Sequence, residues 1–353
     1  MPVYAAGPGA SSGRPLIRLD SNENPYGPSP RAVEAMWMAL SSSNLYPDDN
    51  SADLRHQLAV HHGMPEDQIL VTAGSTDMIA ILCQTLLGPG RNAVTSERSF
   101  IVYPLAVRAT GADLIQTPMR EDSFDLEAIL AAIDENTRLI FVANPNNPTG
   151  TILDSAAIDY FLSRVPDHVI VVLDEAYYEF AAHFAFLRGF MYSNSLDQVK
   201  RGAPVVVLRT FSKAHGLAGL RIGYGIGPAD LFSYCVRMRH TYSVSSVAQA
   251  AALAAMRDQA HIDRAVTSNS QQSKILCDGL AELGMRVFPT SANFICCDVA
   301  EDAAAYTARL REYGISVRPL GFWGAPNSIR ISIGTPEQNQ ALLAAAQKIS
   351  NAR

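Results

Sequence analysis

The chain has 353 residues, 48% of them hydrophobic and 18% charged, so it can bury more core than one domain usually holds. Its formal net charge of -6 provides no basic surface of the kind that phosphate backbones require, which argues against a nucleic-acid partner. The five cysteines form no C-x-x-C pair and have no histidine placed to complete a zinc site, so we expect buried thiols and no metal.

The sequence also lacks the features of a secreted or membrane protein. The start has no apolar stretch of signal-peptide length, and no later segment offers about 18 uninterrupted apolar residues. We therefore expect a cytoplasmic protein with no membrane partner.

The N-terminal region predicts an irregular lead into a helix. Residues 1–15 are small and expected to be mobile, while residues 21–30 hold three prolines and a glycine, which favour an extended arm. A helix is expected at 31–40. Tyr26 lies in the arm and Tyr46 precedes Pro47; on sequence alone, a tyrosine before proline is normally a packing residue.

From residue 68 the chain alternates short apolar runs with helical segments. This alternation is typical of βαβ units that build a mostly parallel sheet covered by helices. Residues 181–202 show no strong period and are expected to form a surface connection. The expected strands are 69–72, 93–96, 139–143, 169–173, 205–208 and 222–226, and the expected helices are 76–87, 102–110 and 154–163.

Polar residues follow several of these strands. Gly74, Ser75 and Thr76 open a helix, where unpaired N–H groups and hydroxyls suit a phosphate, although the same residues also make a good helix cap. Tyr103 follows the next strand and has core packing as its ordinary interpretation. Asn147 lies in the proline-rich loop ANPNNPTG, which is rigid enough to fix its amide.

A carboxylate ends the most apolar strand of the chain. Asp174 follows the run VIVVL and is costly there unless it meets a cation or hydrogen-bond donors, although it can also cap the next helix. Tyr177 lies three residues further on. The position therefore suits a carboxylate that faces a positively charged ligand atom.

The chain is organised around RTFSKAHGLAGLRIGY at 209–224. A lone lysine is usually a solvated surface residue, but Lys213 lies between hydroxyls, with Arg221 eight residues later across a glycine-rich turn. The amine is suited to form a Schiff base with an aldehyde, while Thr210, Ser212 and Arg221 are suited to hold its phosphate. The glycines at 223, 225 and 227 do not match the dinucleotide-binding pattern.

Beyond residue 228 the pattern changes to long helices at 231–240 and 247–283, then to an α+β tail. Arg318 and Arg330 lie in or at the end of apolar strands, so each is expected to have an acidic partner or an anionic ligand. We predict three parts: a start, arm and helix at 1–45, a large domain at 46–235 and a small domain at 236–353.

Three motifs together carry a family resemblance. They are L-x-x-N-E-N-P-x-G at 19–27, N-P-T-G at 147–150 and S-K-A-x-G-L-A-G-L-R at 212–221. From about residue 16 to residue 348 the chain resembles fold-type I aminotransferases that depend on pyridoxal 5'-phosphate, and it looks most like the histidinol-phosphate aminotransferases. The resemblance implies an α/β large domain with a mostly parallel sheet and a smaller α+β C-terminal domain.

The resemblance also implies roles around the cofactor. Lys213, Asp174 and Tyr177 would be catalytic: the lysine binds the cofactor, the aspartate keeps the ring nitrogen protonated, and the tyrosine bonds the 3-oxygen with Asn147. Tyr103 would stack on the ring. The phosphate would be held by Gly74, Ser75, Thr76, Thr210, Ser212, Arg221 and, across a homodimer, the tyrosine at position 46 of the other chain.

For substrate, the resemblance implies that Tyr26, Arg318 and Arg330 bind L-histidinol phosphate and 2-oxoglutarate, giving imidazole-acetol phosphate and L-glutamate in histidine biosynthesis. Asn293 would be a further pocket residue or a structural amide. Residues 241–243 read Thr-Tyr-Ser where relatives usually carry Pro-Phe-Asn, so the substrate stays open. The alternatives are an aromatic amino-acid aminotransferase, a decarboxylase of a phosphorylated amino acid, and a non-catalytic regulator that binds the same cofactor.

Overall fold

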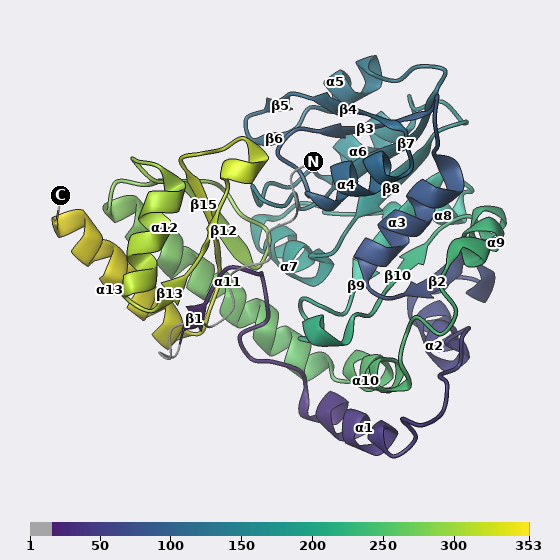
Figure 1. Ribbon diagram of the computed structural model, residues 1–353, viewed down its shortest axis with the longest axis horizontal. Helices are drawn as coiled ribbons and strands as arrows, with labels where there is room; N and C mark the ends of the chain where they lie inside the picture. Colours follow the sequence, from purple (N-terminus) through teal and green to yellow (C-terminus); the bar gives the residue numbers. More distant parts are fainter. Residues whose placement is uncertain (1–15, 353) are drawn as a thin grey trace.

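A computed structural model describes residues 16–352, so the expectation for residues 1–15 lies outside the described part of the chain. Figure 1 shows a large lobe and a smaller one, coloured yellow to green, with the purple N-terminal segment running from the small lobe down to α1 (Pro30–Leu40). In the described part, no helix has both the length and the apolar character needed to cross a membrane.

The large lobe is built on a seven-stranded sheet. Its strands lie in the order β2 (Ile69–Thr72), β10 (Gly223–Ile226), β9 (Val205–Thr210), β8 (Ile170–Asp174), β7 (Thr137–Ala143), β3 (Asn92–Ser96) and β4 (Asp113–Thr117). All recorded pairs are parallel except those of β10, which runs antiparallel to both β2 and β9. The fold class predicted from the sequence is therefore confirmed.

Helices cover this sheet and supply its core. They are α2 (Ala52–His62), α3 (Ser75–Leu86), α4 (Val102–Ala109), α5 (Leu126–Ala131), α6 (Ser155–Leu162), α7 (Tyr178–Arg188), α8 (Ser195–Lys200) and α9 (Ala229–Met238). The central strands β7, β8 and β9 bury nearly every side chain, as expected of parallel strands covered on both faces. Burial on both faces explains why these strands read as continuous apolar runs.

The small lobe packs helices on a four-stranded antiparallel sheet. The strands are β11 (Arg286–Val287), β12 (Phe294–Asp298), β15 (Ser328–Ser332) and β14 (Arg318–Pro319), and the helices are α11 (Gln259–Glu282), α12 (Ala303–Glu312) and α13 (Pro336–Asn351). The N-terminal strand β1 (Ile17–Arg18) pairs in parallel with β13 (Ile315–Ser316). This pairing fixes the start of the arm to the small lobe.

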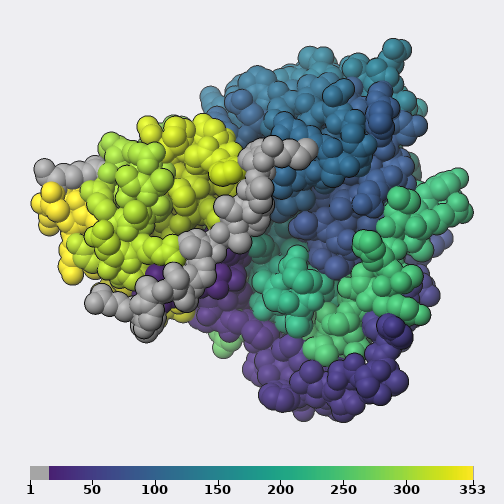
Figure 2. Space-filling model, in the orientation of Figure 1, coloured from purple at the N-terminus to yellow at the C-terminus, as the bar shows by residue number. Residues whose placement is uncertain are grey.

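The arm then continues to α1, which packs on α10 (Ser246–Met256). Figure 2 shows this purple segment at the lower edge of the molecule, beside the green of the chain near residue 250. The buried alanines of α10 belong to the core of the large lobe, although the sequence assigns them to the small domain. The domain limits themselves stay a prediction.

The sequence expectation for residues 181–202 was wrong. This stretch contains most of α7 and all of α8, and α7 buries Phe180, Ala181, Phe184 and Ala185 on one face. Its exposed face also carries Phe186 and Leu187, so apolar residues surround the helix and hide its period.

The sequence analysis also missed β4 and the hairpin of β5 (Met119–Arg120) and β6 (Ser123–Phe124). The remaining short turns are η1 (Glu66–Gln68), η2 (Ala218–Leu220) and η3 (Gly321–Trp323).

Candidate active site

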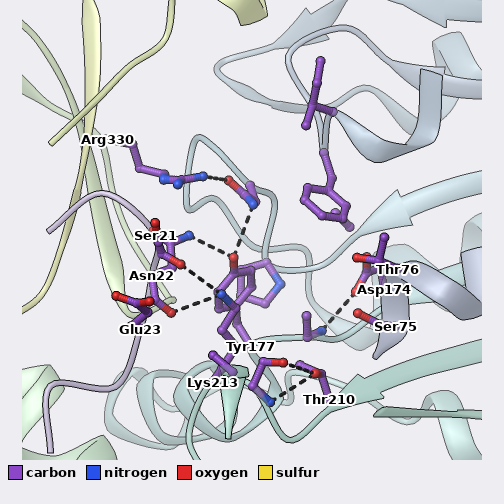
Figure 3. A pocket seen from close by; sticks show the side chains of 18 of the residues that line it. Ser21, Asn22, Glu23, Ser75, Thr76, Asp174, Tyr177, Thr210, Lys213 and Arg330 are labelled. Carbon is purple, nitrogen blue, oxygen red and sulfur yellow. Dashed lines mark hydrogen bonds between the residues drawn. The ribbon is translucent and has the colours of Figure 1, made fainter. Parts of the chain in front are cut away.

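A cavity of about 250 Å³ lies where the carboxyl ends of β7, β8 and β9 meet the arm and the small lobe. Open α/β sheets collect ligands at this end of their strands. Figure 3 shows Lys213 with residues of the arm on one side, and Asp174 with Ser75 and Thr76 on the other. The cavity therefore gathers chemical groups from segments far apart in the sequence.

Lys213 lies three residues beyond the end of β9 and points into this cavity. Its Nζ donates hydrogen bonds to the backbone oxygens of Ser21 and Asn22, at 3.3 and 3.1 Å. Burial, followed by the positive charge of Arg330, lowers the pKa of Lys213 from 10.5 to about 7. A large fraction of the amine is thus neutral and nucleophilic near neutral pH.

Asp174 ends β8 and is buried at the bottom of the cavity. Its Oδ2 accepts a hydrogen bond from the Tyr103 hydroxyl at 2.9 Å, and its Oδ1 accepts one from the backbone N–H of Ala176. Burial raises the pKa of Asp174 from 3.8 to about 6, against the opposite effect of these bonds. A cation placed against this carboxylate would offset the cost of its charge.

A hydrogen-bond network links this region to the small lobe. The Tyr177 hydroxyl accepts from the side-chain amides of Asn22, at 2.9 Å, and Asn147, at 3.3 Å. Arg330 donates from Nη1 to the Asn147 oxygen at 2.6 Å and from Nη2 to the backbone oxygen of Asp20 at 2.9 Å. The arm, the loop after β7 and the strand β15 therefore hold each other in place around the cavity.

The opposite end of the cavity is shaped to hold an anion. Ser75 and Thr76 open α3, whose first N–H groups carry the positive end of the helix dipole. The Thr210 hydroxyl donates to Ser212 at 3.0 Å, and Arg221 reaches the Ser212 hydroxyl at 3.5 Å. We call these side chains, together with the α3 N-terminus, the cup.

Two glycines, whose missing side chains make room for the parts of the cup, lie beside it. Gly74 caps α3 with φ of +87°, and a Cβ there would lie 2.7 Å from Arg221 Nη2. A Cβ at Gly223 would lie 2.8 Å from the Ser75 backbone nitrogen and 2.9 Å from the Arg209 backbone oxygen. The missing Cβ at Gly223 lets β10 approach the start of α3, and the missing Cβ at Gly74 leaves room for the Arg221 guanidinium.

Arg318 and Arg330 are neighbours on two adjacent strands of the small sheet. They are directly paired in the register of β14 and β15, and both line the cavity. Arg318 Nε donates to the backbone oxygen of Asp20 at 3.3 Å, the same oxygen that Arg330 contacts. A guanidinium group binds carboxylate and phosphate oxygens as a fork, so two such groups side by side at the cavity make the pair a candidate anion clamp.

Three predicted site residues, all tyrosines, do not line the cavity of their own chain. Tyr103 is fully buried and stacks on Phe141, so its ring does not face the cavity as expected. Tyr26 bonds to Ser268 and lies over α11, outside the cavity lining. Tyr46 is 82% exposed and stacks on Tyr242. The structure thus groups the cofactor and anion residues predicted from sequence, and of these tyrosines only Tyr103 contacts the group, through its bond to Asp174.

Several residues that line the cavity were given no role by the sequence analysis, among them Asn22, Glu23 and Phe100. Asn22 and Glu23 lie in the arm motif but were not assigned any role, and Phe100 lies three residues before Tyr103. Phe100 and Tyr103 meet edge to face, with ring centres 5.6 Å apart. Because Tyr103 turns beneath Asp174, Phe100 is the ring left facing the cavity. The recurrence of aromatic rings three residues apart in SFIVYP was the available signal.

Comparison with known proteins gives consistent matches along the chain. The family model described as aminotransferase class I and II matches residues 14–345. Histidinol-phosphate aminotransferase 2 of Pseudomonas fluorescens is 42% identical over 334 residues, which cover 95% of this chain and 89% of the relative. Histidinol-phosphate aminotransferase of Akkermansia muciniphila is 41% identical over 92% of this chain and 87% of its own.

A solved structure agrees with these relatives. The histidinol-phosphate aminotransferase of Sinorhizobium meliloti, in complex with pyridoxal-5'-phosphate, superposes with a TM-score of 0.88 at 29% identity, covering 96% of this chain and 92% of that one.

Proposed function

This chain belongs to the aminotransferase class I and II family, and we propose that it transfers the amino group of L-histidinol phosphate to 2-oxoglutarate with the aid of pyridoxal 5'-phosphate. The products are imidazole-acetol phosphate and L-glutamate. The observation that carries the proposal is one cavity that joins an amine of lowered pKa, a buried carboxyl, an anion cup and a pair of arginines.

The residues of this cavity fit the cofactor. The cup, with the space left by Gly74 and Gly223, suits a phosphate monoester. Asp174 is buried and would be relieved by the cationic nitrogen of a protonated pyridine ring. Tyr177 and Asn147 lie together at 3.3 Å, as donors to one phenolic oxygen would.

When bound, the cofactor supplies an aldehyde for an amine and a ring that withdraws electrons from the substrate carbon. We assign two roles to Lys213. Its amine would bind that aldehyde, and, once the substrate has displaced this amine, the free amine would move a proton at the substrate Cα. The neutral form favoured by burial serves both roles. Asp174 would hold the proton on the ring nitrogen, and Phe100, which lines the cavity where Tyr103 does not, would offer the aromatic face for the ring.

Arg318 and Arg330 supply the recognition of substrate charge. Glutamate and histidinol phosphate share an anionic group, and a guanidinium fork accepts the oxygens of either a carboxylate or a phosphate. Arg330 is already fixed by Asn147 and the Asp20 backbone, so little side-chain freedom is lost on binding. The pair therefore serves two chemically different substrates in turn.

The working molecule is proposed to be a homodimer in the cytoplasm. Tyr46 is exposed and does not line the cavity of its own chain, as expected of a residue that completes the cup of a second copy. Tyr26 lies in the N-terminal arm and does not line the cavity of its own chain either, so a role toward substrate would likewise require the second copy. All five cysteines are free thiols, which suits a reducing compartment.

The proposal is tested by following glutamate formation from 2-oxoglutarate with histidinol phosphate as donor. Purified protein is expected to be yellow and to turn over this pair, whereas Lys213→Ala is expected to lose essentially all turnover and the visible band of the lysine-bound cofactor. Turnover by Lys213→Ala at the wild-type rate would contradict the mechanism.

A further inference from the structure

An aromatic pair projects from the surface between the segments that follow α1 and α9. The rings of Tyr46 and Tyr242 stack with centres 4.5 Å apart and planes at 25°. Tyr46 is 82% exposed and Tyr242 is 46% exposed. Aromatic side chains with this much exposure gain little from burial within their own chain, so the stacking serves chiefly to fix how Tyr46 points.

An ion pair between the buried Arg239 side chain and the half-buried Asp49 side chain holds the two segments in register. Asp49, three residues after Tyr46, accepts a hydrogen bond from the Tyr242 backbone N–H and forms an ion pair with Arg239 at 3.0 Å. The Arg239 side chain is only 5% exposed and also donates to the Asp49 backbone oxygen. Gln249 adds a bond to the Asp48 backbone oxygen at 2.9 Å. The segment that carries Tyr46 is therefore tied at several points to the segment that carries Tyr242.

The backbone conformation of Tyr242 indicates that contacts with its surroundings hold this residue in place. Its φ is +57°, in the left-handed region that a bulky residue rarely adopts. Such a conformation persists only where surrounding contacts fix it, and the Asp49 carboxylate provides the contact here. Glycine or asparagine would adopt this backbone more readily, so a ring at this position points to a use for the ring.

We infer that Tyr242 is a positioning residue, which holds the Tyr46 ring in the orientation that lets its hydroxyl reach the cup of a second copy of the chain. The inference rests on the proposed homodimer. It adds that the Tyr46 ring is already oriented before the phosphate binds in the site of the second copy. An exposed tyrosine samples several rotamers, and stacking on Tyr242 removes that freedom before the dimer site binds its phosphate.

The first test measures binding of pyridoxamine 5'-phosphate to the apoenzyme. This probe cannot bond covalently to Lys213, so its Kd reports the non-covalent grip alone. We expect Tyr46→Phe to raise the Kd about tenfold, as the loss of a hydrogen bond to a charged group would. Tyr242→Asn, which tolerates the left-handed backbone but lacks the ring, should raise the Kd toward the same value.

Two variants control this measurement. Tyr242→Phe keeps the stacked ring and every recorded Tyr242 contact, so it should bind the probe like wild type. Tyr46→Phe combined with Tyr242→Asn should bind no more weakly than Tyr46→Phe alone, because a ring without its hydroxyl has nothing left to deliver. Additive effects would overturn the inference.

The second test uses heterodimers in which only one chain keeps Lys213. In the first, one chain carries Lys213→Ala and the other Tyr242→Asn, so the working site receives Tyr46 from a chain with intact Tyr242. In the second, one chain carries both changes and its partner is wild type, so the working site receives a misplaced Tyr46. The readout here is the visible band of lysine-bound pyridoxal 5'-phosphate, which only the site with Lys213 forms. We expect the first heterodimer to form this band at the cofactor concentration that wild type needs, and the second to need the higher concentration of Tyr242→Asn; the reverse order, or equal behaviour, would overturn the inference.

The outcomes also separate this inference from the proposed function. If Tyr46→Phe weakens the probe and Tyr242→Asn does not, Tyr242 has no positioning role while the composite dimer site stands. If Tyr46→Phe leaves the Kd unchanged, Tyr46 does not reach a cup at all, and both the composite site and the inference are wrong.

Discussion

Lys213 and Asp174 lie in the same cavity, and burial shifts their pKa values in opposite directions. The pKa of Lys213 falls from 10.5 to about 7 and the pKa of Asp174 rises from 3.8 to about 6, because desolvation disfavours each charged form. The lysine gains nucleophilicity from this shift. The aspartate instead becomes a group that a bound cation stabilises, so one physical cause gives the two residues different uses.

The lowered pKa of Lys213 predicts a pH dependence for cofactor capture. Only the neutral amine attacks an aldehyde, so the rate at which apoenzyme takes up pyridoxal 5'-phosphate should rise with pH through about 7 and then level off. Rapid mixing across a pH series, followed by absorbance, measures this rate. A midpoint near the ordinary lysine value would show that burial does not control the amine.

Asp174→Asn is expected to stabilise the apoenzyme while it disables the enzyme. Below pH 3.8 the carboxyl is protonated in both folded and unfolded chains, so the substitution changes little. As the pH rises through about 6, the wild-type fold must bear a buried carboxylate at a cost of about 3 kcal/mol, which the variant avoids. Denaturant unfolding of both apoenzymes at pH 5 and pH 8 (roughly one unit below and two above that value) should show a larger gap at the higher pH. An equal gap at both pH values would count against this account.

Residues that directly follow strands were the most predictable part of the site. Asp174 ends β8, and Lys213 and Asn147 lie in the loops just beyond β9 and β7, so the chain topology brings them to the same edge of the sheet. Tyr103 and Phe100 could not be told apart in this way, because they lie at the start of a helix and its rotation decides which ring faces the cavity. The roles of Asn22 and Glu23 depend on where the arm packs, which residue spacing does not reveal.

At the scale of elements, the cup depends on how closely β10 approaches the start of α3. The approach is possible because position 223 has no side chain, and the atoms that a Cβ would meet there are backbone atoms that cannot rotate away. The strand, the start of the helix and the loop with Arg221 therefore pack closely around the cup.

Gly223→Ala is expected to open the cup. A Cβ at 2.8 Å from the Ser75 nitrogen must push β10 and α3 apart, so pyridoxamine 5'-phosphate should bind about tenfold or more weakly and the melting temperature should fall. Gly219→Ala is the matched control, since a Cβ there meets nothing within 4 Å. The prediction fails if both variants bind the probe equally well.

Elements with a clear period or a complete apolar run were predictable, and those that depend on packing were not. The strands of the large sheet bury both faces and so read plainly in the sequence. Helix α7 was hidden because Phe186 and Leu187 lie exposed on the face where polar residues are expected. Edge strand β4 leaves Asp113 and Gln116 exposed and lacks the apolar run of its neighbours.

At the scale of the whole molecule, exposed apolar residues gather on the N-terminal side. Trp37, Met38, Leu45 and Tyr46 are each more than 60% exposed and lie within ten residues of sequence. Apolar residues concentrated in this way suit an interface between subunits. The proposed homodimer would cover them and complete both cups at once.

Mixing two inactive or weakened chains should restore one site. In a heterodimer of Lys213→Ala with Tyr46→Phe, the chain that retains Lys213 receives an intact Tyr46 from its partner, so about half of the wild-type activity is expected, one working site of two. The measurement is transaminase activity of purified heterodimer against both parent homodimers. Activity no higher than that of the Tyr46→Phe parent would show that Tyr46 acts within its own chain or not at all.

The central claim is that the cavity selects histidinol phosphate, and a comparison of single half-reactions tests it most directly. Stopped-flow mixing of the cofactor-loaded enzyme with histidinol phosphate, and separately with phenylalanine and tyrosine, gives the efficiency with which each donor converts the cofactor. Arg318 and Arg330 bind a phosphate that the aromatic amino acids lack, and a lost charge-assisted bond costs about 1.5 to 3 kcal/mol. We therefore expect histidinol phosphate to react at least about tenfold more efficiently. Equal efficiency with phenylalanine would contradict the account and place the enzyme with the aromatic amino-acid aminotransferases.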